Sequence, residues 1–199
     1  MPSPSLPALV LIGEPGDPVA EALGAPARGL ICVHGQPMLQ RLVATLRECG
    51  CEIVIVGNES LRDAVAAVTE ARFEASPPRI SAKLQAGCAA LGWPRQVMMC
   101  AADSPFVTAD GLRQLMTSVI ERDLELGYPI VPKEACEAQF PGGHRTYVKM
   151  KDGVFTGGNF LTISGAVVRD QGAWIDRFFD ARKSPLALAN LLGSTRPII

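Results

Sequence analysis

The amino-acid sequence predicts an α/β fold, a three-layer α/β/α sandwich with a mostly parallel, mixed central sheet and a small inserted β-hairpin lobe. Two observations carry this prediction. In the first half of the chain, apolar strand-like runs alternate with helix-like segments, as in parallel sheets that helices cover on both faces. In the second half, segment 146–155 alternates apolar and polar residues around Asp152-Gly153, which is a strong β-hairpin signal.

The composition fits one globular domain over residues 1–199, because 48% of the residues are hydrophobic and 20% are charged. Nineteen basic and twenty acidic residues give a net charge of −1, so no overall positive field would attract nucleic acid or an anionic membrane. The apolar run at the N-terminus is too short for a signal peptide or a spanning helix. Any anionic ligand must therefore be bound by local groups.

The six cysteines and two histidines do not form a zinc-binding pattern, since no CxxC pair occurs. Cys32, Cys88 and Cys100 lie within apolar runs and are expected to be small core residues. This cysteine usage favours a reducing, cytoplasmic setting.

The spacing of apolar residues predicts the individual elements. Apolar residues three and four positions apart predict a helix over 37–49, and the β-branched run 52–57 predicts a strand buried on both faces. Similar signals predict strands near 9–12, 96–102, 128–132 and 160–163, and helices at 60–70, at 81–91, from Thr108, at 167–181 and at 186–192. In such folds ligands gather at the carboxyl ends of the strands.

Three features follow predicted strands or lie in loops, and each has two interpretations. The loop Gly13-Glu-Pro-Gly16 is a plain turn or a phosphate cradle, since it lacks both the P-loop pattern and the third glycine of a dinucleotide fingerprint. Arg28 is a surface arginine or a forked phosphate donor. Asp103, directly after a buried strand, caps a turn or holds a hard cation.

The segment Gly157-Gly158-Asn159 lies between predicted strands and also has two interpretations. Its glycines would allow a close approach of ligand to backbone, while the Asn159 amide offers a donor and an acceptor. The alternative is a β-bulge or a bend. Arg145 could add positive potential nearby, or it could simply be solvated.

Five segments, taken in order, carry a family resemblance: LVLIGEPGDP, PARGLICVHGQPML, IVIVG, CAADSPFVT and FPGGHRTYVKMKDGVFTGGNF. They resemble the MobA-like nucleotidyltransferases, which have a Rossmann-like GT-A fold, and the resemblance covers about residues 8–193. It implies a Mg²⁺-dependent enzyme, with Mn²⁺ as the other candidate cation. Such an enzyme transfers an NMP moiety from an NTP to a small phosphorylated acceptor and releases pyrophosphate, chiefly by positioning and electrostatics.

The resemblance also implies roles for two halves of the chain and for particular residues. The half at 8–125 would bind the nucleotide and the half at 126–199 the acceptor. Arg28 and Asp103 would be catalytic, with Asp103 the metal ligand. The nucleotide-binding residues would be Leu11, Ile12, Gly13, Glu14, Gly16 and Arg28, and the acceptor-binding residues would be Arg145, Gly157, Gly158 and Asn159.

This sequence departs from the family pattern at several positions. Glu14 stands where the family has a second glycine, the usual loop arginine is absent, and Arg28 replaces a lysine. A carboxylate at position 14 is expected to weaken phosphate binding unless it turns outward. The late Asp-Val-Asp type element of many relatives is not found, so either Asp103 works with another ligand such as Asn159 or turnover has been lost.

Two other functions compete with the enzyme interpretation. A non-catalytic nucleotide- or metabolite-binding relative is favoured by Glu14, by the missing loop arginine and by the short C-terminus. An NAD-dependent oxidoreductase is disfavoured by the missing third glycine and by the inserted hairpin lobe. The preferred base, the acceptor and the oligomeric state are not predicted from the sequence.

Overall fold

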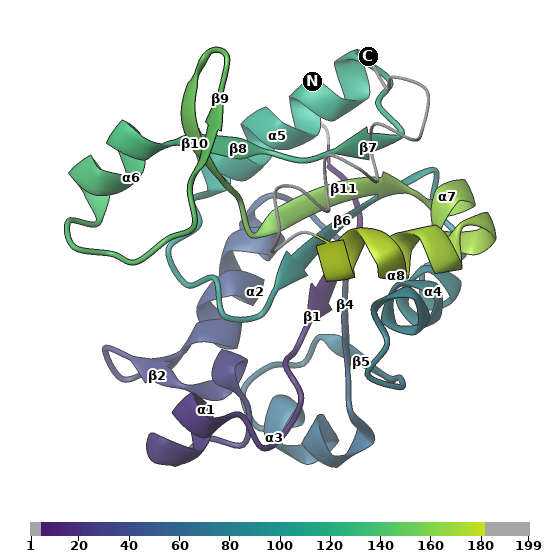
Figure 1. The fold of residues 1–199 in the computed structure, drawn as a ribbon. Helices are drawn as coiled ribbons and strands as arrows, with labels where there is room; N and C mark the ends of the chain where they lie inside the picture. The colour runs from purple at the N-terminus through teal and green to yellow at the C-terminus, as the bar shows by residue number, and fades with distance from the viewer. Residues whose placement is uncertain (1–4, 182–199) are drawn as a thin grey trace.

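A six-stranded sheet forms the centre of the computed structural model, which describes residues 5–181 (Figure 1). The strand order is β5-β4-β1-β6-β11-β7. The parallel strands are β5 (Arg72–Ala75), β4 (Ile53–Gly57), β1 (Ala8–Leu11) and β6 (Gln96–Ala101). Strand β11 (Phe160–Ser164) is antiparallel to its two neighbours, β6 and β7 (Leu126–Gly127). The predicted mixed, mostly parallel sheet is therefore confirmed.

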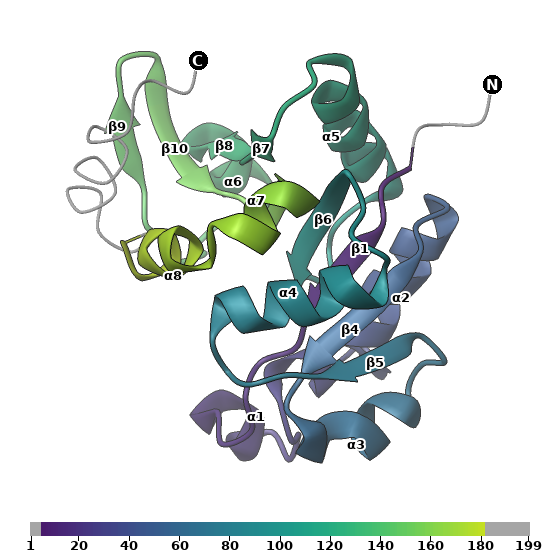
Figure 2. The ribbon, with the colours of Figure 1, turned by 90° about the vertical axis from the view of Figure 1, so that its right-hand side faces the viewer.

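Helices cover both faces of this sheet, which produces the three predicted layers (Figure 2). Alternate strand residues point to opposite faces, so Leu9 packs on one side while Ala8 and Val10 pack on the other. One face is covered by α4 (Ile80–Ala90), α7 (Gly165–Asp170) and α8 (Gly172–Ala181). The other is covered by α2 (Met38–Glu48), α3 (Arg62–Ala66) and α5 (Ala109–Glu121).

The strongest helix predictions are confirmed because they rest on buried apolar stripes and caps. Helix α2 buries Leu39, Leu42, Val43 and Leu46, as the spacing over 37–49 indicates. The Thr108 hydroxyl accepts a hydrogen bond from the Gly111 N–H at 3.2 Å and so caps α5.

Several weaker predictions differ from the structure. The helix expected at 60–70 is a 3-10 turn, Glu59–Leu61, followed by α3, which ends at Ala66. The helix expected at 167–181 is divided at Gln171 into α7 and α8. The helix expected at 186–192 lies outside the described residues.

A small lobe follows the central α/β region and lies at the upper left of Figure 1. Its antiparallel sheet has the order β8-β10-β9, formed by β8 (Ile130–Pro132), β10 (Gly153–Gly157) and β9 (Val148–Met150). The β9–β10 hairpin turns at Asp152-Gly153, as the sequence predicts, and Gly153 has a φ of 147° that favours glycine. Helix α6 (Lys133–Gln139) belongs to this lobe and buries none of its residues, so no apolar stripe predicted it.

Short elements connect β1 to α2. They are α1 (Pro18–Ala22), a 3-10 turn at Arg28–Leu30, and the two-stranded hairpin of β2 (Cys32–Val33) and β3 (Gln36–Pro37). Among the described residues, no helix is long and apolar enough to cross a membrane.

The cysteines correct one prediction. Cys88 and Cys100 are fully buried, but Cys32 is exposed, because β2 is a short ribbon at the surface rather than a strand of the central sheet. All six cysteines are free thiols. Burial raises the pKa of the Cys51 and Cys88 thiols to about 11 and raises the pKa of Cys100 further.

Alkylation of the folded protein near pH 8 should therefore modify Cys32 first. Because the pKa values of Cys51 and Cys88 are about 11, only about one such thiol in a thousand is ionised at that pH. Timed labelling followed by peptide mass spectrometry would check this order. Labelling of Cys88 as fast as that of Cys32 would contradict the burial described above, whereas denaturant should abolish the difference.

Candidate functional site

The candidate site lies at the carboxyl ends of adjacent parallel strands. Strand β1 is paired with β4 on one side and β6 on the other, and Leu11 at its end is level with Val56 and Ala101. The loop that follows β1 therefore lies beside the residues that follow β6, which include Asp103. The structure brings these two sequence candidates to one edge of the sheet.

The backbone conformation favours glycine at only one of the two glycine positions in the first loop. Gly16 has a φ of 82°, which other residues rarely adopt. Gly13 has no positive φ, and a Cβ added there would meet nothing within 4 Å in the described chain. The protein's own packing therefore does not require a glycine at position 13, and the space over its backbone is open.

Arg28 is held against the first loop by Asp17. The Arg28 Nε donates to Asp17 Oδ2 at 2.7 Å, and Asp17 Oδ1 also accepts from the N–H groups of Val19 and Ala20 to cap α1. The hydrogen bond from Arg28 lowers the pKa of Asp17, and the same contact raises the pKa of Arg28. The carboxylate of Asp103 raises the pKa of Arg28 further, so these two predicted site residues lie within electrostatic reach of each other.

Close backbone packing explains how Arg28 comes to the end of β6. A Cβ on the neighbouring Gly29 would lie 2.6 Å from the Cβ of Ala102, so only glycine allows this approach without a shift. Ala102 immediately precedes Asp103. The 3-10 turn that carries Arg28 is thus packed directly against the strand end that carries the carboxylate.

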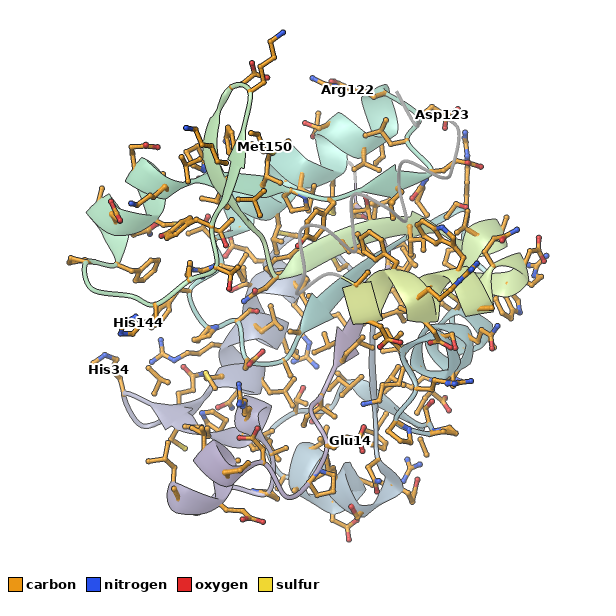
Figure 3. All side chains as sticks on the ribbon, in the orientation of Figure 1. Glu14, His34, Arg122, Asp123, His144 and Met150 are labelled. Carbon is orange, nitrogen blue, oxygen red and sulfur yellow. The ribbon has the colours of Figure 1, made fainter. Side chains whose placement is uncertain are left out.

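Glu14 does not extend freely into solvent. Its Oε1 forms an ion pair with the Lys83 Nζ at 2.5 Å, and its Oε2 accepts from the Asn58 Nδ2 at 3.4 Å. Lys83 also donates to the Ile12 carbonyl at 3.2 Å. Figure 3 labels Glu14 below the end of β1. Glu14 therefore does not turn outward but contacts Lys83 of α4.

Sequence reasoning did not single out Lys83 or Asn58. Asn58 directly follows β4, and that position at a strand end is a signal that could have found it. Lys83 lies in an apolar helix segment, SAKLQAGCAAL, where an unpaired cation would be costly to bury. Its presence among buried neighbours was therefore a recognisable sign of an acidic partner.

A pocket of about 470 Å³ brings together four predicted residues and is called the Asp103 pocket. They are Asp103, Arg145, Gly158 and Asn159, and the exposed rings of Phe106 and Phe140 form part of the same wall. The Asn159 Nδ2 donates to the Ser104 hydroxyl at 3.3 Å, which fixes the amide beside the strand end. Carboxylate, guanidinium and amide groups thus face one pocket.

A second pocket, of about 650 Å³, lies toward α4 and α8 and is called the Tyr128 pocket. Leu11 and Arg79 line it together with Tyr128 and Phe178, and it shares Gly158 and Asn159 with the Asp103 pocket. The turn at Gly158 and Asn159 therefore borders both cavities.

The glycines of the Gly157-Gly158-Asn159 segment are explained by packing. A Cβ at Gly157 would overlap the Tyr128 hydroxyl, and one at Gly158 would lie 3.1 Å from the Pro129 Cγ. This close packing against segment 128–129 is a reason for the glycines that differs from both the ligand approach and the bulge or bend suggested by the sequence.

Asp103 fits a magnesium site that is completed by substrate. Among residues 5–181, no cluster of three or more His, Cys, Asp or Glu residues could hold a metal ion without other ligands. Mg²⁺ commonly binds through one or two carboxylates together with substrate phosphates, and it keeps several waters. The half-buried Asp103 carboxylate, with the Asn159 amide in the same pocket, is consistent with that arrangement.

Comparisons with known proteins agree with this architecture. The MobA-like NTP transferase domain matches residues 9–152. A hypothetical transferase from Thermus thermophilus is 30% identical, with a TM-score of 0.70 and coverage of 94% of this chain and 78% of that one. No curated protein matches the chain.

Two more distant structures show the likeness of fold alone. A CMP:2-keto-3-deoxy-manno-octonic acid synthetase complexed with CTP is 11% identical, with a TM-score of 0.66 and coverage of 95% of this chain and 86% of that one. Rv0371c from Mycobacterium tuberculosis H37Rv, complexed with manganese, is 16% identical, with a TM-score of 0.54 and coverage of 86% and 80%.

In this mixed sheet, the parallel strands β1 and β6 are followed by a glycine-containing loop and an aspartate. Together with these matches, the arrangement defines a nucleotidyltransferase. The family follows from the extent of the domain match and from the Thermus relative. The chain belongs to the MobA-like NTP transferase family. The resemblance and the fold class predicted from the sequence are thereby confirmed.

Proposed function

We propose that this protein is a Mg²⁺-dependent nucleotidyltransferase that transfers an NMP moiety from an NTP to a small phosphorylated acceptor. The observation that carries the proposal is the position of Asp103. It lies within electrostatic reach of Arg28 on the side of the first loop, and it lines one pocket with Arg145 and Asn159. A carboxylate near two cationic groups is suited to a reaction between two phosphates.

The nucleotide is proposed to bind over the first loop. The open space at Gly13 allows a ligand to approach the backbone from Leu11 to Gly16. Within the described residues, the Arg28 hydrogen bond uses Nε alone, so its two terminal nitrogens can donate to phosphate oxygens. The family membership supports this assignment, because an NTP is the substrate class that the domain is named for.

The acceptor is proposed to bind in the Asp103 pocket. Arg145 supplies a positive charge for an acceptor phosphate, and the Asn159 amide can both donate and accept hydrogen bonds. The apolar wall that includes Phe106 and Phe140 would exclude water from part of the bound acceptor. In this assignment, the half at 8–125 binds the nucleotide and the half from 126 onward binds the acceptor.

The proposed reaction is an in-line displacement at the α-phosphorus. An oxygen of the acceptor phosphate forms a bond to the α-phosphorus, while the bond from that phosphorus to the α–β bridging oxygen breaks. The electron pair of the broken bond leaves with pyrophosphate. Arg28 would hold the phosphates of the NTP and Arg145 the acceptor, so the chain's main contribution is to align two anions that repel each other.

Asp103, with Asn159 nearby, would hold the cation. When bound, Mg²⁺ or Mn²⁺ neutralises phosphate charge and helps to orient the two substrates. A relative in fold was solved in complex with manganese, which supports the assignment of a divalent cation to this fold.

The free thiols also support the proposed reducing, cytoplasmic setting.

The first test is calorimetric titration of the purified chain with ATP, GTP, CTP and UTP, with and without Mg²⁺. We expect one NTP to bind in a Mg²⁺-dependent manner and to release pyrophosphate when a suitable phosphorylated acceptor is supplied. NAD serves as the control ligand and should not bind. Nucleotide binding that does not depend on the cation and gives no pyrophosphate would favour a non-catalytic binding protein, and failure of all four NTPs to bind would refute the proposal.

A further inference from the structure

Lys83 is a buried cation whose two side-chain hydrogen bonds, within residues 5–181, are made to Ile12 and Glu14 at the end of β1 and in the first loop. Its side chain is 7% exposed, whereas that of its partner Glu14 is 37% exposed. Nζ donates to Glu14 Oε1 at 2.5 Å and to the Ile12 carbonyl at 3.2 Å. One lysine thus contacts both Ile12, which directly follows β1, and Glu14, the acidic residue of the loop.

The close packing of α4 on the sheet makes this reach possible. Gly87 is one turn beyond Lys83 on the same face of α4. A Cβ at Gly87 would lie 2.6 Å from Leu9 Cδ2 and 3.0 Å from Val56 Cγ2, so the glycine lets the helix approach β1 and β4. Lys83 is therefore held at a fixed height above the end of β1.

The net charge of the Lys83–Glu14 pair matters for nucleotide binding because of where Glu14 lies. Glu14 is the direct neighbour of Gly13, over which the proposed nucleotide would bind. An unpaired carboxylate there would repel the triphosphate, whereas a carboxylate paired with Lys83 adds no net charge. Because Lys83 is buried, solvent screens the pair less than it screens an exposed one.

We propose that Lys83 is a positioning residue for the nucleotide, which acts by neutralising Glu14. The inference rests on the proposed function of the first loop. It explains how the chain carries glutamate where the family pattern has a glycine and still presents a loop able to accept a triphosphate. Lys83 itself does not contact the substrate in this account.

The test compares three variants by NTP calorimetry, thermal unfolding and steady-state kinetics. Lys83→Met leaves the Glu14 carboxylate unpaired, and we expect NTP to bind about tenfold more weakly, a loss that shrinks as salt is added. Glu14→Gln removes the negative charge and should bind NTP within about threefold of the unaltered protein. The double variant should also return to within about threefold, because no carboxylate is left to repel the nucleotide.

The kinetic readout separates positioning from a purely structural role. In Lys83→Met the KM for NTP should rise about tenfold while kcat at saturating NTP stays within about twofold. Arg95→Met is the matched control, since it removes a cation from the exposed ion pair with Asp123, which Figure 3 shows far from Glu14. This control should bind NTP normally. Should Lys83→Met not fold, Lys83→Gln carries the same expectation.

Each outcome decides the inference. The inference is overturned if Lys83→Met binds NTP as tightly as the unaltered protein does. It is also overturned if the double variant binds NTP as weakly as Lys83→Met. Either result leaves the proposed function standing. If the unaltered protein binds no NTP, the proposed function fails, and the inference fails with it. Recovery of NTP binding in the double variant, even with a lowered melting temperature, supports the role in neutralising Glu14.

Discussion

Asp103→Asn should lower the rate of NTP-dependent pyrophosphate release by at least about a hundredfold, because it removes the anionic oxygen that would hold the cation between two phosphates. The midpoint of thermal unfolding should move by less than about 2 °C, since asparagine has nearly the same shape as aspartate. Stopped or coupled pyrophosphate assays and thermal melts measure the two quantities.

Asp110→Asn is the control for this experiment. Asp110 lies in the first turn of α5, and its side chain is 88% exposed. It should leave the rate of pyrophosphate release unchanged. Full activity in Asp103→Asn would remove Asp103 from the site and would leave the Asp103 pocket without its proposed cation ligand.

Gly13→Ala should weaken NTP binding by at least about thirtyfold, because the new methyl group would occupy the space that we assign to the nucleotide. Its effect on folding should be small, since the added Cβ meets nothing within 4 Å and Gly13 does not have a positive φ. Calorimetry and a thermal melt of the same preparation would separate the two effects.

Gly172→Ala is the matched glycine control at the start of α8. Its Cβ would meet only ordinary contacts, with Gln85 Nε2 at 3.4 Å and Ser81 Cβ at 3.6 Å. We expect normal NTP binding in this variant. If Gly13→Ala also binds NTP normally, the nucleotide does not approach the first loop at this residue, and LVLIGEPGDP is a turn rather than a phosphate cradle.

The elements that could be predicted from sequence are those with a buried periodic face. Helices α2 and α5 and strands β4 and β6 each bury a regular set of apolar residues, so their spacing alone indicates their type. Strand β5 has a mixed RFEA pattern at the sheet edge, and α6 buries nothing, so neither has a signal of that kind.

The candidate site was predictable only where its residues follow strands. Asp103 and the first loop could be placed at one edge because parallel strands end together. The pairing of Glu14 with Lys83 and of Arg28 with Asp17 could not be predicted, since these contacts depend on how α4 and the loop before α1 pack in three dimensions. Lys83 is 69 residues from Glu14, and no local spacing reports a contact of that kind.

Asp17 gives Arg28 a resident partner before any substrate arrives. A phosphate that binds only the two terminal nitrogens of Arg28 leaves this contact in place. A phosphate that also takes up Nε must displace a carboxylate already bound at 2.7 Å, so the free energy of that binding is the difference between two charge-assisted contacts. The same carboxylate can recapture the arginine when the phosphate departs, and it continues to cap α1 in either state. The exchange would keep the site from retaining pyrophosphate and would make the release of product easier.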